Sequence, residues 1–115
     1  EDVAAVSVGP FQICALLDTG NLRCWGYGLW GNLGYGSVEP IGDDETPASA
    51  GDIAMGGEIA LLDANGYGHA CAVLEHGGVR CWGFGGAGEL GQPSIFPQGI
   101  GDNETPDMIG YVEVF

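Results

Sequence analysis

Short apolar runs separated by glycine set the pattern of this chain. Runs of this length, rich in β-branched and aliphatic residues and bounded by turn residues, are typical of strands. They predict strands near 3–8, 12–17, 22–26, 59–63, 69–74 and 79–83, with further strands near 53–55 and 108–114. The alternating Val-Glu-Val at 112–114 suits a half-exposed strand. No amphipathic helical pattern persists, so we expect an all-β fold.

The pattern occurs twice. Residues 14–26 read Cys-Ala-Leu-Leu-Asp-Thr-Gly-Asn-Leu-Arg-Cys-Trp-Gly, and 71–83 read Cys-Ala-Val-Leu-Glu-His-Gly-Gly-Val-Arg-Cys-Trp-Gly. The echo ends with Ile-Gly-Asp-Asp-Glu-Thr-Pro at 41–47 and Ile-Gly-Asp-Asn-Glu-Thr-Pro at 100–106. Repeats of this period are stacked or radially arranged units, each too small to bury its apolar face alone. We expect one unit over 1–57 and a second over 58–115.

The composition argues against two classes of function, nucleic-acid binding and membrane insertion. The chain has 115 residues and a formal charge of −14, with 16 acidic side chains and only two arginines. Nucleic acids would be repelled, because binding them needs a cationic surface. No apolar run is long enough to cross a bilayer, so we expect no membrane insertion.

The cysteines lie ten positions apart across a turn signal in each unit. A three-residue hairpin loop with glycine in the left-handed conformation would place Cys14 opposite Cys24 and Cys71 opposite Cys81. Facing cysteines at a non-hydrogen-bonded pair are within disulfide range, so we predict these two disulfides and an oxidising compartment. The alternative is that the cysteines are reduced and pack as small hydrophobes. A zinc site has even less support from the sequence, since directly facing strand residues do not form a tetrahedral cage.

The Cys-Ala-Leu and Cys-Trp-Gly motifs, the Gly-X-Leu-Gly that follows and the downstream Thr-Pro resemble the regulator of chromosome condensation (RCC1) repeat, in its cysteine-bearing bacterial form. The resemblance implies β-propeller blades of about four antiparallel strands each. Members of that family are protein-interaction platforms, in roles from nucleotide exchange on a small GTPase to enzyme inhibition. For this chain it implies a scaffold or protein-interaction module. With the predicted disulfides, we expect this module to be extracellular or on a bacterial cell surface.

Two blades cannot close a propeller, which needs about four to eight. Either further blades of a longer chain supply the remainder, or copies associate head to tail, with residue 115 of one copy near residue 1 of the next. The second arrangement would give rings of six or eight blades or an open filament, in which assembly itself is the function.

The acidic loops at 42–47 and 101–106 are the best candidates for a metal-binding site. Carboxylate and amide oxygens of the kind that calcium prefers come from Asp43, Asp44 and Glu45, and from Asp102, Asn103 and Glu104. Calcium is therefore the one cofactor that the sequence suggests. The alternative is a turn in which aspartate caps backbone amides and Thr-Pro starts the next segment.

The cationic and aromatic residues give the remaining candidates. Arg23 and Arg80 share a strand face with Trp25 and Trp82, and we expect four structural residues: tryptophans in the blade core and arginines stacked and ion-paired, with an acid of the Asp-Glu-Thr-Pro loop as one possible partner. A ligand-binding role for the arginines is the alternative. The glycine-rich loop holds the candidate contact for a partner or subunit, which consists of Tyr27, Trp30 and Tyr35. The alternative is that these rings only pack between blades.

Catalysis has little support. His69 and His76 have no counterpart in the first unit, where Gln12 and Thr19 stand. No convergent set of acid and base residues is evident, so the sequence predicts a protein that is not an enzyme.

Overall fold

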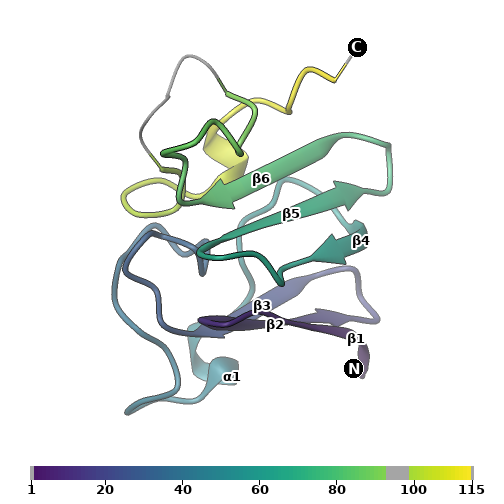
Figure 1. Ribbon diagram of the computed structural model, residues 1–115. Helices are drawn as coiled ribbons and strands as arrows, with labels where there is room; N and C mark the ends of the chain where they lie inside the picture. The colour runs from purple at the N-terminus through teal and green to yellow at the C-terminus, as the bar shows by residue number, and fades with distance from the viewer. Residues whose placement is uncertain (1, 93–98, 115) are drawn as a thin grey trace.

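Two three-stranded antiparallel sheets make up the fold (Figure 1). The computed structural model describes residues 2–92 and 99–114. The first sheet holds β1 (Val3–Val8), β2 (Gln12–Leu17) and β3 (Leu22–Gly26), and the second holds β4 (Ile59–Asp63), β5 (His69–Leu74) and β6 (Val79–Gly83). All six predicted strand ranges are confirmed, and with them the all-β class.

The hairpins have the predicted register. Cys14 faces Cys24 and Cys71 faces Cys81, because Gly20 (φ 88°) and Gly77 (φ 97°) close the turns in the left-handed conformation. Only glycine adopts that conformation without a steric penalty, so these two residues fix which strand residues oppose each other. The structure joins both cysteine pairs as disulfides.

The prediction of further strands near 53–55 and 108–114 is wrong. Both segments run beside the third strand of their sheet, but each is held there by one strand-type bond: the Ile53 amide donates to the Leu22 carbonyl, and the Val112 amide donates to the Val79 carbonyl. Among the described residues each sheet therefore has three strands instead of about four. Within the same ranges each sheet gains only an isolated bridge, Gly26 to Ile41 or Gly83 to Ile100.

Short helices precede both segments. In the first repeat Thr46 caps α1 (Pro47–Ala50), where proline occupies the first turn. In the second repeat proline again starts η2 (Pro106–Met108). Proline fixes a helical φ, and η2 includes residue 108, the first residue of the second predicted strand. In the described part of the chain, neither helix has the length or the apolar character needed to cross a membrane.

The core lies between the two sheets. The first sheet contributes Cys14, Leu16, Leu22 and Cys24, and the second contributes Ala70, Ala72, Leu74 and Trp82. These are opposite faces of equivalent blades, because the residues equivalent to Cys14 and Cys24 are Cys71 and Cys81, on the far side of the second sheet. The blades therefore stack front to back, and each leaves one outer face without a blade against it.

Candidate functional site

Polar side chains tie the two blades together at the strand ends. Gln12 is almost fully buried, and its amide nitrogen donates to the carbonyls of Ala64 (2.6 Å) and Gly66 (3.3 Å) in the second repeat. Its amide oxygen accepts from the side-chain amide of Asn32 (2.6 Å), and the backbone carbonyl of Asn32 accepts from the Trp82 indole (3.0 Å). The seam between blades thus has specific donors and acceptors as well as apolar packing.

The outer face of blade 2 is equivalent to the face of blade 1 that packs at the seam, but no blade lies against it. We define this face by Leu61, Cys71, Val73, Val79 and Cys81, most of which line a shallow apolar hollow. Leu61 is 67% exposed, and both cysteines are half-buried. The equivalent cysteines of blade 1 are fully buried, because blade 2 covers them.

His69 occupies the position of Gln12 on this face. Its Nδ1 is buried without a hydrogen-bond partner in the described structure. The ring lies beside a second hollow lined by Asp63, Asn65, Gly66 and Cys71. A ring nitrogen in this place corresponds to the Gln12 amide that bonds to the next blade.

The outer face of blade 1 is also apolar. Val6 and Val8 are exposed on β1 and face Ala15 and Ile13, which share a sheet face with Trp25. Trp25 is half-buried, whereas Trp82 in the equivalent position of blade 2 is fully buried in the core. The predicted core role therefore fits the position of Trp82 better than that of Trp25.

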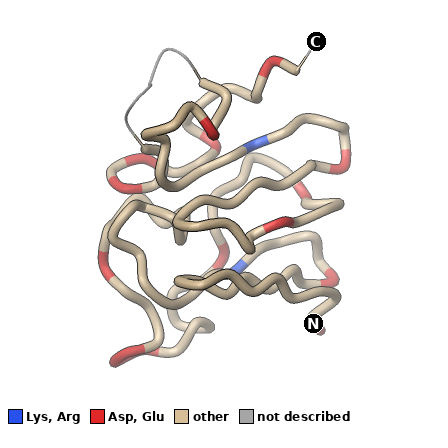
Figure 2. Tube along the Cα trace, viewed as in Figure 1, with Lys and Arg blue, Asp and Glu red and all other residues tan. Residues whose placement is uncertain are grey.

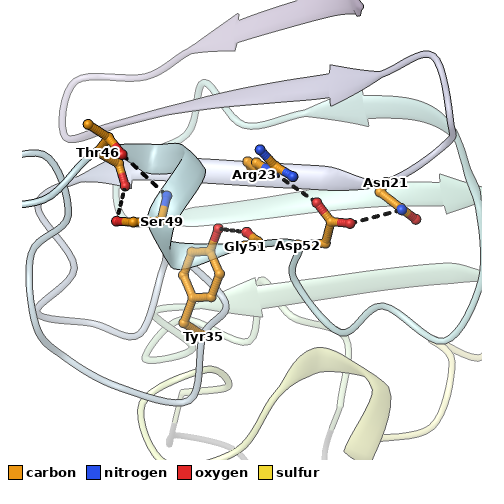
Figure 3. A network of polar contacts seen from close by, with 7 residues as sticks. All are labelled: Asn21, Arg23, Tyr35, Thr46, Ser49, Gly51 and Asp52. Atoms are coloured by element: carbon orange, nitrogen blue, oxygen red, sulfur yellow. Dashed lines mark hydrogen bonds and ion pairs between the residues drawn. The ribbon is translucent and has the colours of Figure 1, made fainter. Parts of the chain in front are cut away.

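An aromatic cluster lies at the strand ends, where the two blades meet. It contains two of the three predicted contact residues, Tyr27 and Trp30. Neighbouring rings stand 5.1 to 6.3 Å apart. We call this cluster the aromatic edge: Phe11, Tyr27, Trp30, Tyr67 and Phe84. Tyr35 lies apart from it, since its hydroxyl donates to the Gly51 carbonyl (2.7 Å) near α1 (Figure 3).

The residues of the aromatic edge that the sequence reasoning missed are Phe11, Tyr67 and Phe84. Phe11 directly precedes β2, Phe84 directly follows β6, and Tyr67 lies two residues before β5. Position just outside a strand end was the only available signal. It does not show that residues more than fifty positions apart meet.

The two arginines are held differently. Arg23 forms an ion pair with Asp52 (2.8 Å), which also accepts from Asn21 (Figure 3). Asp52 follows α1 and lies outside the Asp-Glu-Thr-Pro loop, so pairing of Arg23 with an acid of that loop stays a prediction. Arg80 is buried and donates to the carbonyls of Pro106 (3.0 Å) and Ile109, with its guanidinium over the Tyr111 ring.

The acidic loops use carboxylates to hold their own backbone. Asp43 accepts from the Asp44 amide (2.9 Å), and Glu45 accepts from the Gly42 amide (2.8 Å). Asp102 and Glu104 repeat both bonds in the second loop, with Asn103 and Gly101 as donors. Oxygens of Asp43, Asp44 and Glu45 lie within 4.8 Å of one another. The loops thus have the geometry of capped turns, and calcium binding stays a prediction.

The pKa values of Asp43 and Glu45 shift in opposite directions. The Asp44 amide bond lowers the pKa of Asp43. For Glu45 the Gly42 amide lowers the pKa, but desolvation and the neighbouring carboxylates outweigh it, so the pKa of Glu45 is raised. The pKa of Tyr35 is raised by burial.

Known proteins resemble the chain over most of its length. No protein-family model matches it. It is 36% identical over 98 residues, 85% of the chain, to an RCC1 domain-containing mitochondrial protein (RUG3) of Arabidopsis thaliana, and 30% identical over 81% of the chain to the ultraviolet-B receptor UVR8 of the same plant. The chain spans about a fifth of the length of each.

Solved structures share the fold. Prp20p of Saccharomyces cerevisiae, described with its binding properties to Gsp1p and histones, superposes with a TM-score of 0.64 over 90% of the chain and 23% of that protein, at 16% identity. Human WBSCR16 gives a TM-score of 0.63 over 89% of the chain and 24% of that protein, at 22% identity. With the stacked antiparallel sheets, these similarities show that the chain consists of RCC1-like repeats, folded as neighbouring blades of a β-propeller.

Proposed function

We propose that this chain is a non-enzymatic protein-interaction module whose propeller is completed by further blades of the same repeat. The blades come from a longer repeat array or from other copies bound head to tail. The units are the repeats 1–57 and 58–115. The observation that carries the proposal is the outer face of blade 2. There Cys71, Cys81 and His69 have no blade against them, whereas their counterparts Cys14, Cys24 and Gln12 in blade 1 are buried against blade 2.

The internal seam supplies the template for this contact. Gln12 donates to carbonyls of the next blade, and the Gly20 carbonyl accepts from the Ile59 amide across the same seam. Moved forward by one blade, the seam places His69 and Gly77 against the first strand of a new blade. That blade would present an apolar face such as Val6 and Val8 offer in blade 1.

A second candidate function is structural assembly. The two outer faces differ, so a contact between them is heterologous and propagates into a ring or a filament. In this case the polymer would be the function, as a ring of six or eight blades or as a fibre.

Partner and location follow from the relatives and the cysteines. Prp20p, which shares the fold, has binding properties to Gsp1p and to histones, and this supports a protein partner for this chain as well. The two disulfides favour an oxidising location, and we propose an extracellular or bacterial cell-surface site.

Sedimentation velocity over a range of protein concentrations tests the completion of the propeller by copies of the chain. We expect growth into trimers, tetramers or longer species. Val79→Glu and Val6→Glu should each restore the monomer, because a charge would be buried at the contact; the counterpart of Val79 in blade 1, Leu22, is fully buried. Met108→Glu, which changes an exposed apolar residue of η2, is the control. A folded chain that stays monomeric at every concentration would overturn self-association.

A further inference from the structure

The aromatic edge exposes ring surface to solvent. Tyr67 is 74% exposed, and Tyr27 and Phe84 are each more than 40% exposed, as is the neighbouring Leu29. Trp30 packs beneath them against the backbone of Gly68. Contiguous apolar surface of this kind on a folded protein marks an interaction site.

The edge lies at the ends of strands and not on a sheet face. Phe11 precedes β2, while Tyr27 and Phe84 directly follow β3 and β6, so the rings gather on the side opposite the hairpin turns (Figure 1). A further blade packs on a sheet face. The edge is therefore a surface separate from the outer faces that we propose for blade completion.

The backbones of two acidic residues lie beside glycines that neighbour Tyr27 and Trp30 in the sequence. The Glu39 carbonyl lies against Gly28, and the Asp102 backbone lies so close to Gly31 that an added Cβ there would collide with it. Figure 2 shows acidic positions in the loops on this side of the molecule, whereas the two cationic positions lie within the strands. Both arginines are held within their own blades, by Asp52 and by the carbonyls around η2.

Rings and carboxylates together select the charge of a ligand. The face of an aromatic ring attracts a cation, and nearby carboxylates add direct attraction. An acidic segment would be repelled by a chain of charge −14. We propose that the aromatic edge binds a protein segment rich in arginine or lysine, with cationic side chains over Tyr27 and Phe84 and with Glu39 and Asp102 as ionic partners.

The probe is a synthetic peptide in which arginine alternates with serine. The same peptide with glutamine at each arginine is its neutral control. Binding is measured by fluorescence anisotropy at physiological salt and at a protein concentration low enough to keep the chain unassociated. We expect Tyr27→Ala combined with Phe84→Ala to weaken binding about tenfold, from roughly 0.5–1 kcal/mol for each cation–π contact. Met108→Ala is the control for loss of exposed apolar surface.

A matched pair of charge variants separates a site from general attraction to an acidic protein. Glu39→Gln with Asp102→Asn removes two charges at the edge, and Asp18→Asn with Glu75→Gln removes two at the hairpin turns. We expect the first pair to weaken binding about threefold and the second to have little effect. Equal losses for the two pairs, no effect of the aromatic variants, or equal binding of the glutamine peptide would each overturn the proposal.

Discussion

The guanidinium of Arg80 lies 4.1 Å from the centre of the Tyr111 ring, in the place where its counterpart Arg23 forms an ion pair with Asp52. Asp52 and Tyr111 occupy equivalent positions, because the residue after each of them, Ile53 or Val112, donates its amide to the third strand of its own sheet. Equivalent arginines thus contact a carboxylate in blade 1 and an aromatic ring in blade 2.

This exchange predicts different salt dependence for the two blades. Asp52→Asn should lower the free energy of unfolding by up to about 1 kcal/mol at low salt, and the loss should shrink in molar salt because the pair is partly exposed. Tyr111→Leu should cost about 1 kcal/mol with little change on adding salt, because an uncharged ring partner is screened less. Urea denaturation at two salt concentrations measures both. Equal salt responses would contradict this interpretation.

The glycines of the two hairpin turns form a natural control pair. Gly20→Ala should destabilise the chain more than Gly77→Ala. Both variants force alanine into a left-handed conformation, at a cost of roughly 1–2 kcal/mol. In Gly20 the added Cβ would also lie 2.6 Å from the Cβ of Glu58 across the seam, whereas at Gly77 nothing lies within 4 Å.

Denaturation of the two alanine variants measures this difference, which we expect to be about 1 kcal/mol or more from the clash. If a further blade docks on blade 2, Gly77→Ala should also weaken that association. Equal destabilisation by the two variants would show that the seam yields without cost at Glu58.

The two disulfides should differ in their reduction. Cys14 and Cys24 are fully buried under blade 2, whereas Cys71 and Cys81 lie half-buried on an outer face. Thiol–disulfide exchange needs access to sulfur, so mild reductant should open Cys71–Cys81 first. Alkylation followed by peptide mass spectrometry identifies the reduced pair at each time. Simultaneous loss of both pairs would mean that reduction follows global unfolding.

The hairpins show what the sequence could predict. Glycine at positions 20 and 77 set the turns, the turns set the register, and the register set the cysteine pairs. Each of these steps uses residues within about ten positions of one another, where spacing decides geometry.

Contacts between repeats were beyond the same reasoning. The sequence placed Arg23 beside acids but not beside Asp52, since α1 brings Asp52 back along β3. It compared Gln12 with His69 but did not show that Gln12 bonds to the next blade at Ala64. Pairings of this kind depend on how whole sheets stack, and no local spacing encodes that.

Tyr35 predicts a loss of stability in alkali. Burial raises its pKa above the usual 10.0, so the folded chain holds this proton more tightly than the unfolded chain. The contribution is complete below pH 10 and is lost as the pH rises through the folded pKa. Tyr35→Phe should lower stability by about 1 kcal/mol at neutral pH, because the bond to the Gly51 carbonyl is lost. It should also flatten the alkaline slope. A slope unchanged in Tyr35→Phe would assign it to other groups.

Calcium binding at the first acidic loop is the remaining prediction. Each of Asp43 and Glu45 uses an oxygen on a loop amide, which leaves the second oxygen of each carboxylate for a cation. Sites on exposed loops have dissociation constants of about 0.1–1 mM. We therefore expect millimolar calcium to raise the melting temperature by a few degrees, about 2–5 °C. Asp43→Asn with Asp44→Asn should abolish the effect, whereas Asp102→Asn should change it less, because Asn103 already leaves that loop with fewer carboxylates. Calorimetric titration and thermal melts in sodium chloride of matched ionic strength provide the measurement, and an equal rise with sodium alone would reduce both loops to capped turns.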